Sequence, residues 1–171
     1  MLIQGSVLAL TNKASDAVQI ISTGLAAMRA TGTTFWTPLY LSNLAGAYAE
    51  LGKFEDTRRC IDEAMTAVET SKESCFEAEV NRIAGEIALK SPEPDVAQAE
   101  DYFERALAVA RQQQAKSWEL RASMSLARLW RDQGKVQQAR ELLAPIYGWF
   151  TEGFDTLDLK EAKALLDELA V

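Results

Sequence analysis

Three arginines spaced along one helical face are the side chains in this sequence best suited to bind an anion. Arg121, Arg128 and Arg131 follow one another at intervals of seven and three residues, so on an α-helix they share one face. Guanidinium groups bind carboxylates and phosphates through charge-assisted, often bidentate hydrogen bonds. The stripe therefore predicts either a site for an acidic ligand or an exposed, solubilising face paired with nearby acids such as Glu119 or Asp132.

The sequence offers little of the chemistry on which enzymes and metal sites depend. It contains no histidine, which removes His-based acid–base catalysis, Ser-His triads and the commonest metal ligand. Acidic pairs such as Asp158 with Glu161 are typical of solvated helix faces or of favourable positions near a helix start. We therefore expect no catalytic residue, no cofactor and no metal site, and no enzyme activity in this chain.

One glycine pair imitates a phosphate-binding loop without matching it. Five residues separate Gly46 from Gly52, where the P-loop motif has four. Phe54 follows Lys53 at the position where the motif needs Ser or Thr to hold magnesium. The sequence therefore does not predict a nucleotide site.

Composition bounds the partners and the compartment of this chain. Its 171 residues carry a formal net charge of −7, which repels nucleic acids and anionic membranes, so we expect neither as a partner. The absence of a signal-peptide pattern and of a long apolar stretch predicts a cytoplasmic protein. Cys60 and Cys75 belong to no CxxC or Cys/His cluster, so we expect reduced thiols on helix faces.

A repeat of about forty residues positions the side chains. A small residue recurs at Ala17, Thr57, Ala99 and Ala139, at intervals of 40, 42 and 40 residues, each time within the same two-helix pattern. Such a period is typical of helix-hairpin solenoids, in which each unit stacks on its neighbours. The sequence predicts an all-α, right-handed solenoid of about four antiparallel helix hairpins.

The second unit shows the hairpin pattern most clearly. Leu41, Leu44 and Tyr48 fall on one face of a helix. Gly52 follows the last of these turns and can adopt the left-handed conformation that closes a helix, after which a second helix begins. Gly134 stands at the equivalent turn of the fourth unit. These signals predict one domain over 1–171, divided into repeats at about 1–32, 33–71, 72–114 and 115–150, with a C-terminal capping helix at 156–170.

The first unit lacks most of its first helix. We therefore expect its apolar residues to have no preceding unit to pack against and to favour a homodimer through the truncated N-terminal repeat. These residues are Leu2, Ile3, Val7, Leu8 and Leu10.

The repeat pattern resembles the tetratricopeptide repeat. The general pattern is Leu with Ala or Gly, then an aromatic or aliphatic residue three positions on, Gly in the turn and Ala in the following helix. The usual repeat has about 34 residues, so we expect the additional residues to lengthen the second helix and the inter-repeat loop, for example at 68–72. The resemblance implies a scaffold that binds proteins.

Several strings give a narrower resemblance that covers nearly the whole chain. The strings at 30–33, 76–79, 106–113, 117–130 and 147–156 resemble the C-terminal repeat region of bacterial proteins that join a class III adenylate or guanylate cyclase domain to a predicted ATPase domain. The resemblance implies that this chain is a fragment of a larger signalling protein. Cyclase and ATPase activity would then lie upstream, since no motif for either is present.

The repeat geometry predicts where a partner binds. In stacked hairpins the first helix of each repeat lines the concave surface, and its positions not used for packing point into the groove. We expect a protein or peptide partner there, such as the upstream domains of the same polypeptide. The alternative is a small-molecule sensor with its ligand on the same surface. The predicted groove residues are Ser42, Gly46, Ala49, Asn81, Gly85, Ala88, Arg121, Met124, Arg128 and Arg131.

Overall fold

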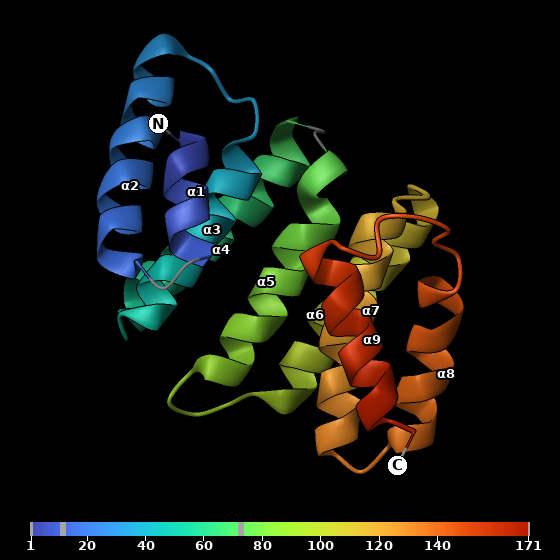
Figure 1. Cartoon of the computed structure of the whole chain (residues 1–171). Coiled ribbons are helices and arrows are strands. Elements are labelled where there is room, and N and C mark those ends of the chain that lie inside the picture. Colours follow the sequence, from blue (N-terminus) through green and yellow to red (C-terminus); the bar gives the residue numbers. More distant parts are fainter. Residues whose placement is uncertain (1, 11–12, 72–73, 171) are drawn as a thin grey trace.

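The computed structural model describes residues 2–10, 13–71 and 74–170, and these are helical throughout apart from short connections. Successive α-helices pair as hairpins, α1 with α2, α3 with α4, α5 with α6 and α7 with α8 (Figure 1). The predicted all-α solenoid of helix hairpins is confirmed. The helices are α1 (Leu2–Leu10), α2 (Ala14–Thr31), α3 (Thr37–Glu50), α4 (Phe54–Ser71), α5 (Glu77–Lys90), α6 (Val96–Gln112), α7 (Lys116–Asp132), α8 (Val136–Tyr147) and α9 (Leu157–Glu168), with a 3₁₀ turn, η1, at Ser74–Phe76.

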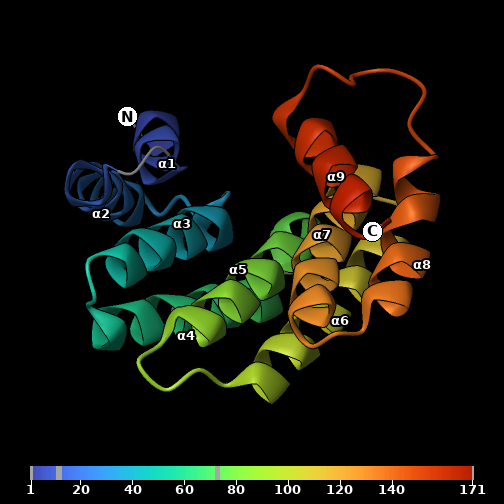
Figure 2. The ribbon, with the colours of Figure 1, turned by 60° about the horizontal axis from the view of Figure 1, so that its bottom comes forward.

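The helices form two layers. The first helices of the hairpins, α1, α3, α5 and α7, contact one another in succession, and α9 continues this row by contacting α7. The second helices, α2, α4, α6 and α8, lie on the other side of the row. Figure 2 shows the ribbon curving so that the first helices are on the inside of the curve and α5 is at its base.

Glycines close the hairpins at the predicted places. Gly52 has φ 69° and Gly134 has φ 78°, both in the left-handed region that glycine adopts at little cost. The amides of the residues that follow them, Lys53 and Lys135, donate to carbonyls five residues back in the helix, at 2.9 and 2.8 Å. These bonds satisfy carbonyls that the helix end would otherwise leave unpaired.

The small residues of the repeat lie where helices cross. Ala17, Ala99 and Ala139 are fully buried and Thr57 is 1% exposed. Small side chains at such crossings let helix axes approach closely. The repeated pattern therefore marks the packing between layers, as the sequence predicted.

The last helix closes the C-terminal end of the array. Leu159, Ala162 and Leu165 of α9 are buried against a cluster that includes Leu120 of α7 and Leu143 of α8. The predicted capping helix is thus present, and it lies where the first helix of a further repeat would lie. Among the described helices, none is both long and apolar enough to cross a bilayer.

Candidate interaction surface

The inner surface of the curve carries the side chains that link neighbouring helices of the inner row, together with Gly46 and Asp132 on the same helix faces. On each helix these residues recur every three or four positions, the spacing of one helical face. We call this set the inner face. It comprises Asn43, Gly46 and Glu50 of α3, then Glu79, Arg82, Glu86 and Lys90 of α5, and Arg121, Ser125, Arg128 and Asp132 of α7.

Polar contacts link the first helices along this face. Asn43 of α3 donates through Nδ2 to the Ser6 hydroxyl of α1 at 2.9 Å. At the other end of α3, Glu50 forms an ion pair with Lys90 of α5. Gly46 lies between these two contacts on the same side of α3, since it is three residues after Asn43 and four before Glu50.

A half-buried ionic cluster joins α5 to α7. Arg82 donates to both carboxylate oxygens of Glu79, at 2.7 and 2.9 Å, and also pairs with Glu86. Arg121 brings a second guanidinium to within 3.3 Å of Glu79, and the Ser125 hydroxyl donates to Glu86 at 3.0 Å. Burial alone lowers the pKa of Arg82, but its hydrogen bonds and charge interactions with Glu79 and Glu86 outweigh burial and raise it.

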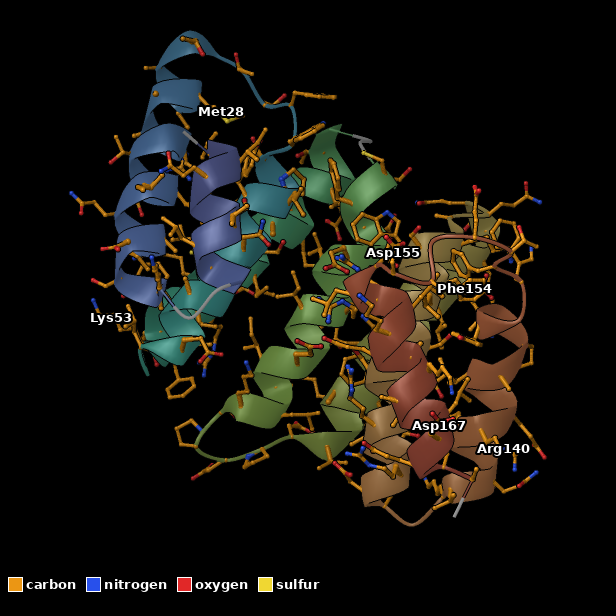
Figure 3. The ribbon with its side chains drawn as sticks, viewed as in Figure 1. Met28, Lys53, Arg140, Phe154, Asp155 and Asp167 are labelled. Carbon is orange, nitrogen blue, oxygen red and sulfur yellow. The ribbon has the colours of Figure 1, made fainter. Side chains whose placement is uncertain are left out.

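The arginine stripe is paired with acids of α9. Arg121 donates to Asp158 at 2.8 Å and Arg128 donates to Glu161 at 2.8 Å. Arg131 forms a 2.6 Å hydrogen bond with Glu168. Side chains of α5, α7 and α9 meet along this row in Figure 3. The stripe therefore serves first as an internal docking surface for the last helix.

The nearby acids that the sequence suggested as partners of this stripe differ in their roles. Asp132 does pair with Arg131, at 2.9 Å. Glu119 instead lies at the corner between α6 and α7, where it accepts from Arg111 at 3.1 Å and from Lys116 at 2.7 Å. Glu119 therefore stabilises the corner and makes none of the contacts of the arginine stripe.

Six of the predicted groove residues are buried between helices and do not line an open surface. In each case the next residue in the chain carries a side chain that faces inward or is more exposed. Successive side chains on an α-helix differ in direction by about 100°, so for these six residues the predicted groove position was wrong by one residue. The six buried residues are Ser42, Ala49, Asn81, Gly85, Ala88 and Met124. The other four predicted groove residues are not buried, and their role as partner contacts stays a prediction; they are Gly46, Arg121, Arg128 and Arg131.

Two predicted glycines illustrate the difference. A Cβ atom at Gly46 would meet no atom within 4 Å, so this position is open. A Cβ atom at Gly85 would lie 2.5 Å from the ring of Phe103. Gly85 therefore admits the Phe103 side chain of α6 beneath α5, and its small size serves packing.

A pocket of about 360 Å³ opens between α5 and α7 at this point of the inner face. Its apolar part consists of Leu89, Phe103 and Leu129. Charged residues of both signs surround it, among them Lys90 and Asp132. The predicted groove residues do not include this pocket, because Phe103 belongs to a second helix. The signal in the sequence that indicates it is Gly85, which leaves room for the Phe103 ring.

No protein-family model and no curated protein matches the sequence. Among solved structures, the chain is similar to a Podospora anserina protein described as a kinesin light chain with nearly identical TPR-like repeats. The TM-score is 0.69 at 15% sequence identity, over 98% of this chain and 82% of that chain. The likeness shows a tetratricopeptide-like fold.

Proposed function

We propose that this chain is a non-catalytic scaffold that binds a polypeptide segment along its inner face. The observation that carries the proposal is the pocket between α5 and α7, whose apolar floor interrupts a surface of charged side chains. Pockets of this kind hold the large apolar anchors that dominate the energy of protein interfaces. Its charged rim offers hydrogen-bond partners of both signs to the polar residues that flank such an anchor.

The partner that fits this surface is a helix or an extended segment with one large apolar side chain. Leu89, Phe103 and Leu129 would receive that side chain, while Gly46 lets the partner's backbone come close to α3. The arginines are engaged by α9, so a purely acidic segment would have to displace the acids of that helix. We therefore expect the apolar anchor to contribute more to affinity than the charges.

We further propose that the array is the C-terminal regulatory region of a bacterial, cytoplasmic cyclase–ATPase signalling protein. The strings that resemble such proteins support this proposal. The inner-face partner would then be an upstream domain of the same polypeptide. A blot of source lysate with an antibody against this chain should show a band several times heavier than 18.9 kDa; a band at that mass would contradict the proposal.

Substitution of Gly46 tests the inner face without disturbing the fold. Gly46→Arg places a long side chain into open space on α3. Thr66→Arg, on the exposed side of α4, is the matched control. We expect calorimetric titration with the separately expressed upstream domains to show at least tenfold weaker binding for Gly46→Arg and unchanged binding for Thr66→Arg. Equal affinity of both variants would place the partner on another surface.

The inner-face pocket also favours a second candidate function, that of a small-molecule sensor. A volume of about 360 Å³ falls within the range of small-molecule sites. A metabolite that binds only the native state raises its stability by mass action. Saturable thermal stabilisation that is lost in a pocket-filling Ser125→Phe variant would favour sensing over peptide binding.

We also propose that the N-terminal end can form a homodimer. Ile3 is 65% exposed and Val7 is 54% exposed on α1, four residues apart and so on one side of the helix. Sedimentation equilibrium should show a concentration-dependent dimer that Ile3→Glu weakens. A monomer at all concentrations would exclude this contact.

A further inference from the structure

A second pocket lies on the opposite side of α5 from the inner face. It has a volume of about 330 Å³ and is bounded by α4, α5 and α6 and by the connection between α5 and α6. On α5 the inner face uses Arg82 and Glu86, whereas this pocket uses Ala84 and Ile87. The two pockets are therefore separate sites on either side of one helix.

The chain forms this outer pocket by departing from its own repeat. In the second and fourth hairpins a glycine turn joins the two helices, but the α5–α6 connection contains Pro92 and Pro94, which prevent a continuous helix. Asp95 starts α6 by accepting a 2.9 Å hydrogen bond from the Gln98 amide. The helix α4 contacts α5 less extensively than α2 contacts α3 or α6 contacts α7, which leaves space between the outer helices.

The floor of the outer pocket is apolar and its rim is polar. Ile61 of α4 and Ala84 and Ile87 of α5 supply the floor. Gln98 and Tyr102 of α6 supply an amide and a phenol at the rim. This combination is typical of sites that hold an amphipathic molecule, with its apolar part buried and its polar groups oriented by a few side chains.

The charged residues of α4 that face the pocket differ in their pairing from those that face away from it. Away from the pocket, Arg59 pairs with Asp56 and Glu63 pairs with Arg29. On the pocket side, neither the Arg58 guanidinium nor the Asp62 carboxylate has an ion-pair partner within the described ranges.

Arg58 and Asp62 are nonetheless spaced as i and i+4, the arrangement in which helix charges commonly pair. One unpaired charge of each sign thus borders the same apolar floor. Glu93, on the α5–α6 connection, adds a further carboxylate to the rim. The rim therefore presents charged groups of both signs.

We propose that the outer pocket binds a small amphipathic zwitterion, with the carboxylate and ammonium group of an amino acid and an apolar side chain. Arg58 binds the carboxylate through charge-assisted hydrogen bonds. Asp62 and Glu93 bind the ammonium group. Ile61 and Ile87 receive the apolar side chain. Such a ligand bridges α4 and α6 across α5, a contact that the protein itself does not make extensively.

NMR titration of the full isotope-labelled chain with L-phenylalanine tests the proposal, with L-leucine and L-tryptophan as smaller and larger apolar bodies. We expect at least one of the three to bind with a dissociation constant of about 1 mM or tighter and to shift amide signals of α4, α5 and α6. Two analogues, 2-phenylethylamine and 3-phenylpropanoate, each carry only one of the two charges. We expect both to bind at least tenfold more weakly than phenylalanine.

Four exposed positions on α4 supply the variants and their controls. Arg58→Gln and Asp62→Asn should each weaken binding of the zwitterion about tenfold or more, because each removes a charged partner. Arg59→Gln and Glu63→Gln remove neighbouring charges that face away from the pocket and should leave affinity unchanged. Absence of binding by all three amino acids, equal binding of the singly charged analogues, or equal effects of all four variants would each overturn the proposal.

Discussion

At the scale of single residues, two glycines of the first helices have opposite requirements. Gly46→Ala should stabilise the fold by about 0.5–1 kcal/mol, because alanine is the better helix former and its methyl group meets open space. Gly85→Ala should destabilise it by about 1–3 kcal/mol through overpacking against Phe103, which is 1% exposed and cannot move aside. Urea unfolding of both variants checks the prediction; changes of the same sign would contradict it.

The two cysteines should differ in reactivity. Burial raises the pKa of Cys60 to about 11, which leaves almost no thiolate at neutral pH. Cys75 is exposed in η1. Mass spectrometry after brief iodoacetamide treatment should find Cys75 alkylated and Cys60 intact in the native protein, and both alkylated in urea. Rapid alkylation of Cys60 in the native state would show that α4 opens readily.

Residue identity predicted the inner face only partly. The groove prediction placed Ser42 and Gly85 at first-helix positions that are not used for packing, but both are buried, and tight helix packing needs such small residues. A stripe of small residues therefore cannot distinguish an open face from a crossing. The inward residues Arg82, Glu86 and Ser125 lie one position after predicted ones and are recognised only from contacts with the neighbouring helix.

At the scale of elements, the docking of α9 combines apolar packing with ion pairs, and the packing should dominate. Leu159→Ala should cost about 2–5 kcal/mol because Leu159 is 4% exposed within the last core cluster. Arg128 and Glu161 are partly exposed, so a double-mutant cycle should give a coupling of about 1 kcal/mol or less. Urea unfolding measures both; a coupling larger than the loss in Leu159→Ala would reverse this ranking.

The corner between α6 and α7 should lose stability in acid. Burial raises the pKa of Glu119, but hydrogen bonds from Lys116 and Arg111 outweigh it and lower the pKa below its ordinary value. A carboxyl group whose pKa is lower in the folded state stabilises the fold at pH values above its unfolded-state pKa. This stabilisation is lost as the pH falls through its folded-state pKa. Glu119→Gln should therefore lower the free energy of unfolding by about 1–2 kcal/mol at neutral pH. In acid its free energy of unfolding should approach that of the parent protein, as measured by unfolding at a series of pH values. A constant difference would exclude this origin.

Helix periodicity predicted the capping role of α9 but not its charge partners. The apolar residues of α9 recur at helical spacing, so the sequence itself shows a face to be buried. The acids that pair with the arginine stripe are distant in the chain; Asp158, for example, lies 37 residues after Arg121. Spacing along one helix cannot reveal such a pair, because it depends on where the next helix packs.

At the scale of the whole molecule, the period of the repeat predicted a stack of hairpins. The curvature of that stack and the space between α4 and α6 depend on helix contacts that the period does not specify. Within the described residues the buried core forms three clusters, and α5 belongs to two of them. Val80 and Ala84 join the cluster of the first two hairpins, and Ala88 joins the cluster around Phe103. Both pockets adjoin α5, so this helix connects the two halves of the array.

This arrangement predicts that damage at the junction separates the halves. In a linear array each unit depends on its neighbours, so loss of one interface need not unfold the rest. Phe103→Ala should cost about 3–5 kcal/mol and accelerate hydrogen exchange mainly in α5, α6 and α7, while α3 keeps much of its protection through the first cluster. Leu165→Ala, in α9 at the C-terminal end of the array, should accelerate exchange mainly in α8 and α9. If Phe103→Ala instead removed protection equally from all helices, the molecule would be one cooperative unit, and a ligand in either pocket would stabilise every helix alike.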